Sequence, residues 1–217
     1  KADELSEEMA GNRSLFEQAE TLKEIPDNGK TIPYTDDSES HATGLAIAKH
    51  KIQQCNRLDE IIREKLKAAV KSGVDVRGAA KTRTRTYVPK FDKKNFEESH
   101  PDLYQDFLIE SFNWYQRFLP DNKFKKSISI NMEPNSEEFL TQAKDIEVLI
   151  ENTTSKDEAY LLNEPVLLLK QLRAIADYDE KISEAKLKVA CDANLAIDGL
   201  CKWQRERKVS ETFDEME

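Results

Sequence analysis

Basic residues alternate with threonines from Lys81 to Tyr87, a stretch that reads KTRTRTY. If the stretch is a β-strand, Lys81, Arg83 and Arg85 share one face and lie about 6.6 Å apart, because alternate side chains of a strand point to the same side. That spacing is close to the spacing of successive phosphates in an extended nucleic acid, and Tyr87 is placed to stack on a base. Cations on an exposed strand also discourage edge-to-edge pairing. A binding role and a purely structural role therefore both stay open.

A weaker copy of this pattern, KWQRERK, lies near the end of the chain. Its candidate nucleic-acid-binding residues are Lys202, Trp203, Arg205 and Arg207, with Lys208 in the same run. Both basic runs precede a Phe-Asp pair, at Phe91-Asp92 and Phe213-Asp214, and both follow a long amphipathic segment. The repetition predicts two copies of one helix-then-strand module, the second one truncated.

Side chains that could perform catalysis do not converge. Glu184-Ala185-Lys186 matches a tripeptide of metal-dependent nucleases, but it lies in a predicted helix, where its two charged side chains point about 200° apart. His41, His50 and His100 are irregularly spaced, and no glycine-rich phosphate loop is present. We predict a non-enzymatic protein with no catalytic residue, no metal site and no cofactor.

The charge of the chain is unevenly distributed. Over 217 residues the net charge is −9, which argues against a protein that coats nucleic acid uniformly. Residues 1–40 carry eleven acidic and four basic residues, whereas residues 77–94 carry seven basic residues and one acidic residue. The three cysteines form no paired motif, which is typical of reduced thiols in a cytoplasmic protein, and no apolar run predicts a membrane span.

Hydrophobic periodicity predicts an α+β, predominantly helical fold. The expected elements are helices over 43–72, 102–115, 136–152 and 163–196, a hairpin over 74–88, a strand over 127–131 and a basic strand near the end of the chain. The aromatic helix 102–115 is expected to hold the first core. We divide the chain into an acidic arm or linker (1–43), a first helix-strand-helix module (44–119) and a second, partial module (120–217).

The stretch FDKKNFEESHPDLYQDF, residues 91–107, continues the first basic run. Together with that run, and more loosely with residues 199–214, it resembles the region that follows the nuclease domain in YqaJ-like phage recombinases, and the small proteins that accompany them. The resemblance implies a role in phage or prophage DNA recombination or replication, in a bacterial or phage-infected cell. It supplies no catalytic residue, because this chain lacks the nuclease centre.

Three functions are compatible with these features. The first is a non-enzymatic accessory protein that binds DNA, or a DNA-processing enzyme, through the basic strands. The second is an acidic protein-interaction module that inhibits a host nuclease or defence complex, for which the net charge of −9 speaks. The third is a helical scaffold whose long helices associate, as in a coiled coil, into a homo-oligomer.

Overall fold

The computed structural model describes residues 7–8, 10–73, 76, 91–131 and 137–213, and it confirms an α+β fold that is predominantly helical. The elements are α2 (Arg13–Lys23), β1 (Thr31–Ile32), α3 (Asp36–Lys71), α4 (Lys93–Ser99), α5 (Pro101–Asp106), β2 (Leu108–Pro120), α6 (Asn122–Asn131), α7 (Glu137–Asn152), the 3-10 helix η2 (Lys156–Leu162), α8 (Asn163–Cys191), β3 (Ala196–Ile197) and β4 (Cys201–Phe213). Apart from buried Val76, the predicted hairpin 74–88 lies outside the described residues.

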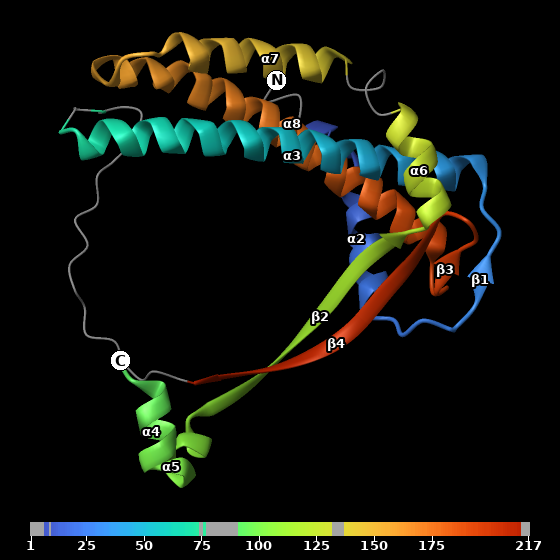
Figure 1. Cartoon of the computed structure of the whole chain (residues 1–217). Helices are drawn as coiled ribbons and strands as arrows, with labels where there is room; N and C mark the ends of the chain where they lie inside the picture. The colour runs from blue at the N-terminus through green and yellow to red at the C-terminus, as the bar shows by residue number, and fades with distance from the viewer. Residues whose placement is uncertain (1–6, 9, 74–75, 77–90, 132–136, 214–217) are drawn as a thin grey trace.

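The two longest helices, α3 and α8, form the spine of the molecule and run antiparallel along each other (Figure 1). Thr35 and Ser38 start α3 with a capping box, in which each side chain accepts a hydrogen bond from the other residue's backbone N–H. The apolar face of α3 then repeats at helical spacing and is buried at Leu45, Ala48, Cys55, Leu58 and Ile62. An ion pair between Lys51 and Asp179 (2.8 Å) joins the two helices across this contact.

Two apolar clusters occupy opposite ends of the spine. One is formed by α3, α7 and the first half of α8, where Phe139 and Ile146 pack among the leucines of α8. The other is formed where α6 and the strands meet the end of α8, and it includes Phe124, Ile128 and Trp203. Helix α2 packs along α8 as well, with Asn12 donating to the hydroxyl of Tyr178 (3.1 Å).

The strands form one sheet in the order β1-β3-β4-β2. Strands β1 and β3 are two residues each and pair in parallel, whereas β2 and β4 pair antiparallel from Leu108↔Phe213 to Pro120↔Cys201. The β2–β4 ribbon begins at the second apolar cluster and projects away from the helices, with α4 and α5 at its far end (Figure 1). We call the helices with β1 and β3, excluding α4 and α5, the body.

Two predicted elements are wrong. The expected helix 102–115 ends at Asp106, and most of its aromatic residues belong to strand β2, outside any core: Phe112 is exposed. Pairing with β4, which is remote in sequence, overrides the local helical spacing. The expected strand 127–131 is part of helix α6, because Phe124 and Ile128 lie four residues apart and both enter the second cluster.

The described residues give no support to a repeated module. Strand β4 pairs with β2, and α3 packs along α8, so segments of both predicted modules share the same packing. Residues 1–43, expected as an arm, contain α2, β1 and the first turns of α3, and these elements belong to the body, where they pack against α8 and β3. The helices expected over 136–152 and from 163 onward are confirmed as α7 and α8, with α8 ending at Cys191.

Candidate nucleic-acid interface

The two faces of the β2–β4 ribbon carry different side chains, because successive residues of a strand point to opposite sides. The first, the aromatic face, consists of Leu108, Glu110, Phe112, Trp114, Gln116 and Phe118 from β2 with Trp203, Arg205, Arg207 and Val209 from β4. The second, the basic face, consists of Ser111, Asn113, Tyr115, Arg117 and Leu119 from β2 with Lys202, Gln204, Glu206, Lys208 and Ser210 from β4. Contacts across the ribbon follow this division, as Phe118 stacks on Trp203 and Ser111 bonds to Ser210.

Trp203 and Arg205, both predicted to bind nucleic acid, lie on the aromatic face where it meets the body. Trp203 is 0% exposed, and its ring centroid lies 5.3 Å from that of Phe118. Arg205 is 8% exposed and donates hydrogen bonds to the backbone carbonyls of Leu22, Asp192 and Asn194. Because both are enclosed by the body, neither is accessible to a nucleic acid. They hold the ribbon to the body instead.

The other two predicted residues of this run lie on opposite faces of the ribbon. Lys202 is exposed on the basic face, whereas Arg207 is exposed on the aromatic face, with its guanidinium carbon 4.1 Å from the centroid of the Phe112 ring. Residues 202–208 therefore do not form one continuous binding surface. The residues predicted in the first basic run, Lys81, Arg83, Arg85 and Tyr87, lie outside the described residues.

Strand β2 adds two residues to the basic face that sequence reasoning missed, Tyr115 and Arg117. Tyr115 is 38% exposed, and two cations lie over its ring, with Nζ of Lys208 at 4.3 Å and the guanidinium carbon of Arg117 at 5.6 Å from the ring centroid. Their signal was the alternation of Ser111, Asn113, Tyr115 and Arg117 with Phe112, Trp114, Gln116 and Phe118, three of which are aromatic. Reading this segment as helix concealed it.

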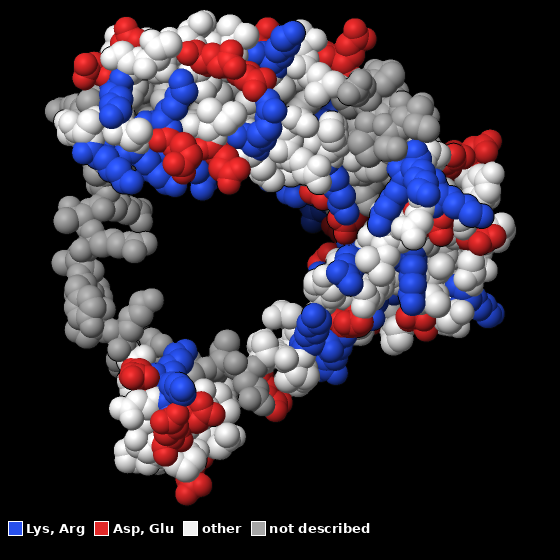
Figure 2. Space-filling model, viewed as in Figure 1, with Lys and Arg blue, Asp and Glu red and all other residues white. Residues whose placement is uncertain are grey.

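The basic face carries three cations and one acidic residue. Glu206 accepts a hydrogen bond from the amide of Gln204, and the carbonyl oxygen of Gln204 accepts one from Nε of Arg117 (3.0 Å). Within the described part of the chain, no carboxylate forms an ion pair with Arg117, Lys202 or Lys208. Figure 2 shows Lys and Arg side chains along the ribbon with acidic side chains beside them, and both signs of charge over the long helices.

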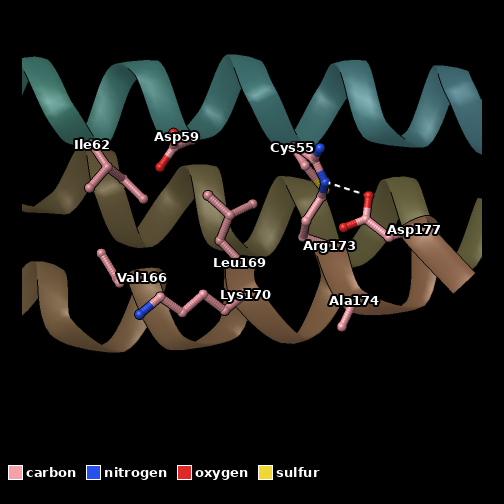
Figure 3. A pocket seen from close by; sticks show the side chains of 9 residues that line it. All are labelled: Cys55, Asp59, Ile62, Val166, Leu169, Lys170, Arg173, Ala174 and Asp177. Atoms are coloured by element: carbon pink, nitrogen blue, oxygen red, sulfur yellow. Dashed lines mark hydrogen bonds and ion pairs between the residues drawn. The ribbon is translucent and has the colours of Figure 1, made fainter. Parts of the chain in front are cut away.

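A groove between α3 and α8 is the other concave feature of interest, with a volume of about 310 Å³ (Figure 3). Asp59, Arg173 and Asp177 in its lining already have partners in the protein, since Asp59 pairs with Arg63, Nε of Arg173 donates to Asp177 (2.7 Å) and another nitrogen of Arg173 donates to Asn56. Burial raises the pKa of Cys55 in its wall to about 11, so this thiol is protonated at neutral pH. The groove therefore offers no activated thiol.

The remaining titratable groups show no arrangement for catalysis in the described residues. Burial raises the pKa of Cys191 to about 11 and that of Cys201 to about 12, so both thiols are protonated and unreactive at neutral pH. Burial and the nearby Lys186 lower the pKa of His41. No three His, Cys, Asp or Glu side chains among these residues gather where they could hold a metal ion.

None of the helices in the described ranges is both long and apolar enough to cross a membrane. Comparisons with protein-family models, curated proteins and solved structures found no match to this chain. The geometry of the ribbon is therefore the feature of this chain that bears on its function.

Proposed function

We propose that this protein binds nucleic acid through the basic face of its β2–β4 ribbon, as an accessory protein without catalysis of its own. The observation that supports this proposal is the arrangement of Arg117 and Lys208 around the exposed ring of Tyr115, with Lys202 further along the same face. Cations that contact phosphates next to an aromatic ring that stacks on bases are the combination that nucleic-acid-binding surfaces use.

The shape of the ribbon fits this role. The major groove of B-form DNA is about 12 Å wide and admits a two-stranded β-ribbon. Lys202 pairs with Leu119 and Lys208 pairs with Asn113. These two pairs are six residues apart along the strands, so the two lysines are separated by about 20 Å. The cations therefore span several phosphates of one strand, while the body remains outside the groove.

The net charge of −9 predicts weak binding that depends strongly on salt. Each phosphate neutralised in duplex DNA contributes about −0.9 to the slope of log K against log salt concentration, so three contacts give a slope of roughly −2.7. A slope near this value would match the three cations of the basic face. Single strands give about −0.7 per contact, or roughly −2 in total.

The proposal is tested by fluorescence anisotropy with labelled single-stranded and duplex DNA at low salt. We expect the triple variant R117E/K202E/K208E to lose binding to at least one of these forms. The matched control is K49E/K144E/K181E, which changes the net charge equally through three exposed lysines of α3, α7 and α8, and it should retain most of the affinity. Absence of binding by the unmodified protein, or an equal loss in both variants, would show that the proposal is wrong.

A role in DNA recombination or replication remains a proposal that depends on the resemblance of residues 81–107 to YqaJ-associated regions. It is supported by the combination of a basic ribbon with a sequence that has no nuclease motif. This combination is expected of a protein that holds DNA for a separate enzyme. Co-purification with a nuclease or annealing protein that is lost in R117E/K202E/K208E would extend the proposal to that setting. Binding of DNA alone would support only the narrower function.

A further inference from the structure

The aromatic face of the ribbon is covered by the body over only part of its length. At its inner end Phe118 and Trp203 are buried. Further out the same stripe continues uncovered, with Phe112 52% exposed and Val209 56% exposed. An isolated two-stranded ribbon is marginally stable in water, so this outer segment is an apolar surface that lacks the cover its inner neighbours have.

We propose that a second copy of this chain covers the outer segment of the aromatic face. In the proposed dimer the two ribbons pack face to face and antiparallel, about a two-fold axis that lies between them at the level of the Phe112↔Val209 pair. Sheets packed in this way lie about 10 Å apart, with their side chains interdigitated between them. An isologous contact of this kind presents the same patch from both copies and closes without further growth.

The length of the uncovered segment matches this symmetry. The part of the aromatic face that is clear of the body ends at Trp114, whose partner Arg207 is exposed, because at the next level Arg205, the partner of Gln116, is 8% exposed and bonded to the body. The levels from Glu110 to Trp114 are centred on Phe112. A two-fold axis there places Glu110 of the second copy opposite Trp114, so these levels of the two ribbons cover each other, and Leu108 of each copy reaches the edge of the other body.

Charge supports the same register. Glu110 and Arg207 are both exposed on the aromatic face, and neither has an ion-pair partner in the described ranges. Arg207 pairs in register with Trp114, two residues from the proposed axis on one side, and Glu110 lies two residues from it on the other side. The two-fold axis therefore brings Glu110 of each copy to the level of Arg207 of the other, which forms two equivalent ion pairs.

This inference is independent of the proposed function. The basic face lies on the other side of each ribbon, so pairing of the aromatic faces leaves both basic faces outward. A dimer without DNA binding, or DNA binding by a monomer, would separate the two proposals. The long helices, which sequence patterns suggested as the oligomer contact, take no part in this interface.

Sedimentation equilibrium of the full chain tests the interface by charge reversal and charge exchange. The unmodified protein should form dimers, and both R207E and E110R should raise the dimer dissociation constant by about tenfold or more, since each places like charges opposite each other. The double variant E110R/R207E restores opposite charges and should return the constant to within about threefold of the original value. Its recovery distinguishes a broken contact from a misfolded ribbon.

Crosslinking provides a second measurement. A bismaleimide should link F112C to the same residue of the second copy, whereas Y115C on the basic face should remain unlinked; the native thiols are buried in both variants. A monomer at every concentration would overturn the proposal. So would a dimer that charge reversal leaves intact, or equal crosslinking of the two cysteine variants.

Discussion

The inner and outer halves of the β2–β4 ribbon share one continuous backbone ladder but differ in what supports it. In the inner half Trp203 and Phe118 stack in the core, and Arg205 ties the strand to carbonyls of α2 and of the turn after α8. In the outer half the equivalent positions, Phe112 and Arg207, contact each other and solvent. The same residue types therefore act as structural anchors in one half and as free surface in the other.

This difference shows that residue type alone does not identify a binding residue in a basic strand. Arg205 and Arg207 are two residues apart and point to the same side, yet only Arg207 is available to a partner. The distinguishing factor is distance along the ribbon from the body. Substitutions at matched positions of the two halves should therefore give unequal effects.

The largest difference is expected between Trp203→Ala and Phe112→Ala. Removing the buried indole should lower the free energy of unfolding by about 3–5 kcal/mol, because it leaves a cavity in the second apolar cluster. Phe112→Ala removes a half-exposed ring and should cost about 1 kcal/mol or less. Urea unfolding followed by circular dichroism measures both values, and similar losses would contradict the distinction between the halves.

A smaller difference is expected between Arg205→Ala and Arg207→Ala. Without Arg205, the carbonyls of Asp192 and Asn194 each lose the hydrogen bond that its guanidinium donates, at a cost of about 1–3 kcal/mol in total. Arg207 donates no hydrogen bond to a carbonyl within the described residues, so its removal should change stability by less than about 0.5 kcal/mol. Thermal unfolding of the two variants side by side makes the comparison, and equal midpoints would count against an anchoring role for Arg205.

The smallest difference concerns thiol chemistry at the two ends of β4. Burial raises the pKa of Cys201 from 9.0 to about 12, so at pH 8 it should react with a thiol reagent only when the protein opens. Ser210→Cys, at an exposed outer position, should react quickly. The protonated thiol of Cys201 contributes its stability fully below pH 9, and this contribution is lost as the pH rises toward 12. Equal labelling rates of the thiols at positions 201 and 210 would contradict the assignment of the first as buried and the second as exposed.

Local sequence patterns predicted the helical body and the basic strand β4 but missed strand β2. Helices α3, α7 and α8 follow from apolar residues at helical spacing, such as Leu45, Ala48 and Cys55 on α3, because a helix buries a face made of nearby residues. The start of α4 also follows locally, since Asp92 accepts a hydrogen bond from the backbone of Asn95. These are short-range features that the sequence displays directly.

Strand β2 depends on contacts that local patterns do not contain. Its apolar residues satisfy a helical spacing through Leu108 and Phe112 as well as a strand alternation through Phe112 and Trp114, and only pairing with β4 decides between them. The basic face also depends on this pairing, because the pairing brings Tyr115 and Arg117 of β2 beside Lys208 of β4. Half of the candidate site was therefore invisible until the pairing was known.

The pairing of β2 with β4 also has a consequence for synthesis of the chain on the ribosome. Ser111 and Ser210 are hydrogen-bonded neighbours in the ribbon but lie 99 residues apart in the chain. At a synthesis rate of about 5–20 residues per second, β4 follows β2 after roughly 5 to 20 seconds, and Phe112 and Trp114 are exposed during this time. The long helices form from local contacts in that interval, so the ribbon that we propose for nucleic-acid binding is completed after them, and β2 is a segment that a chaperone would protect during translation.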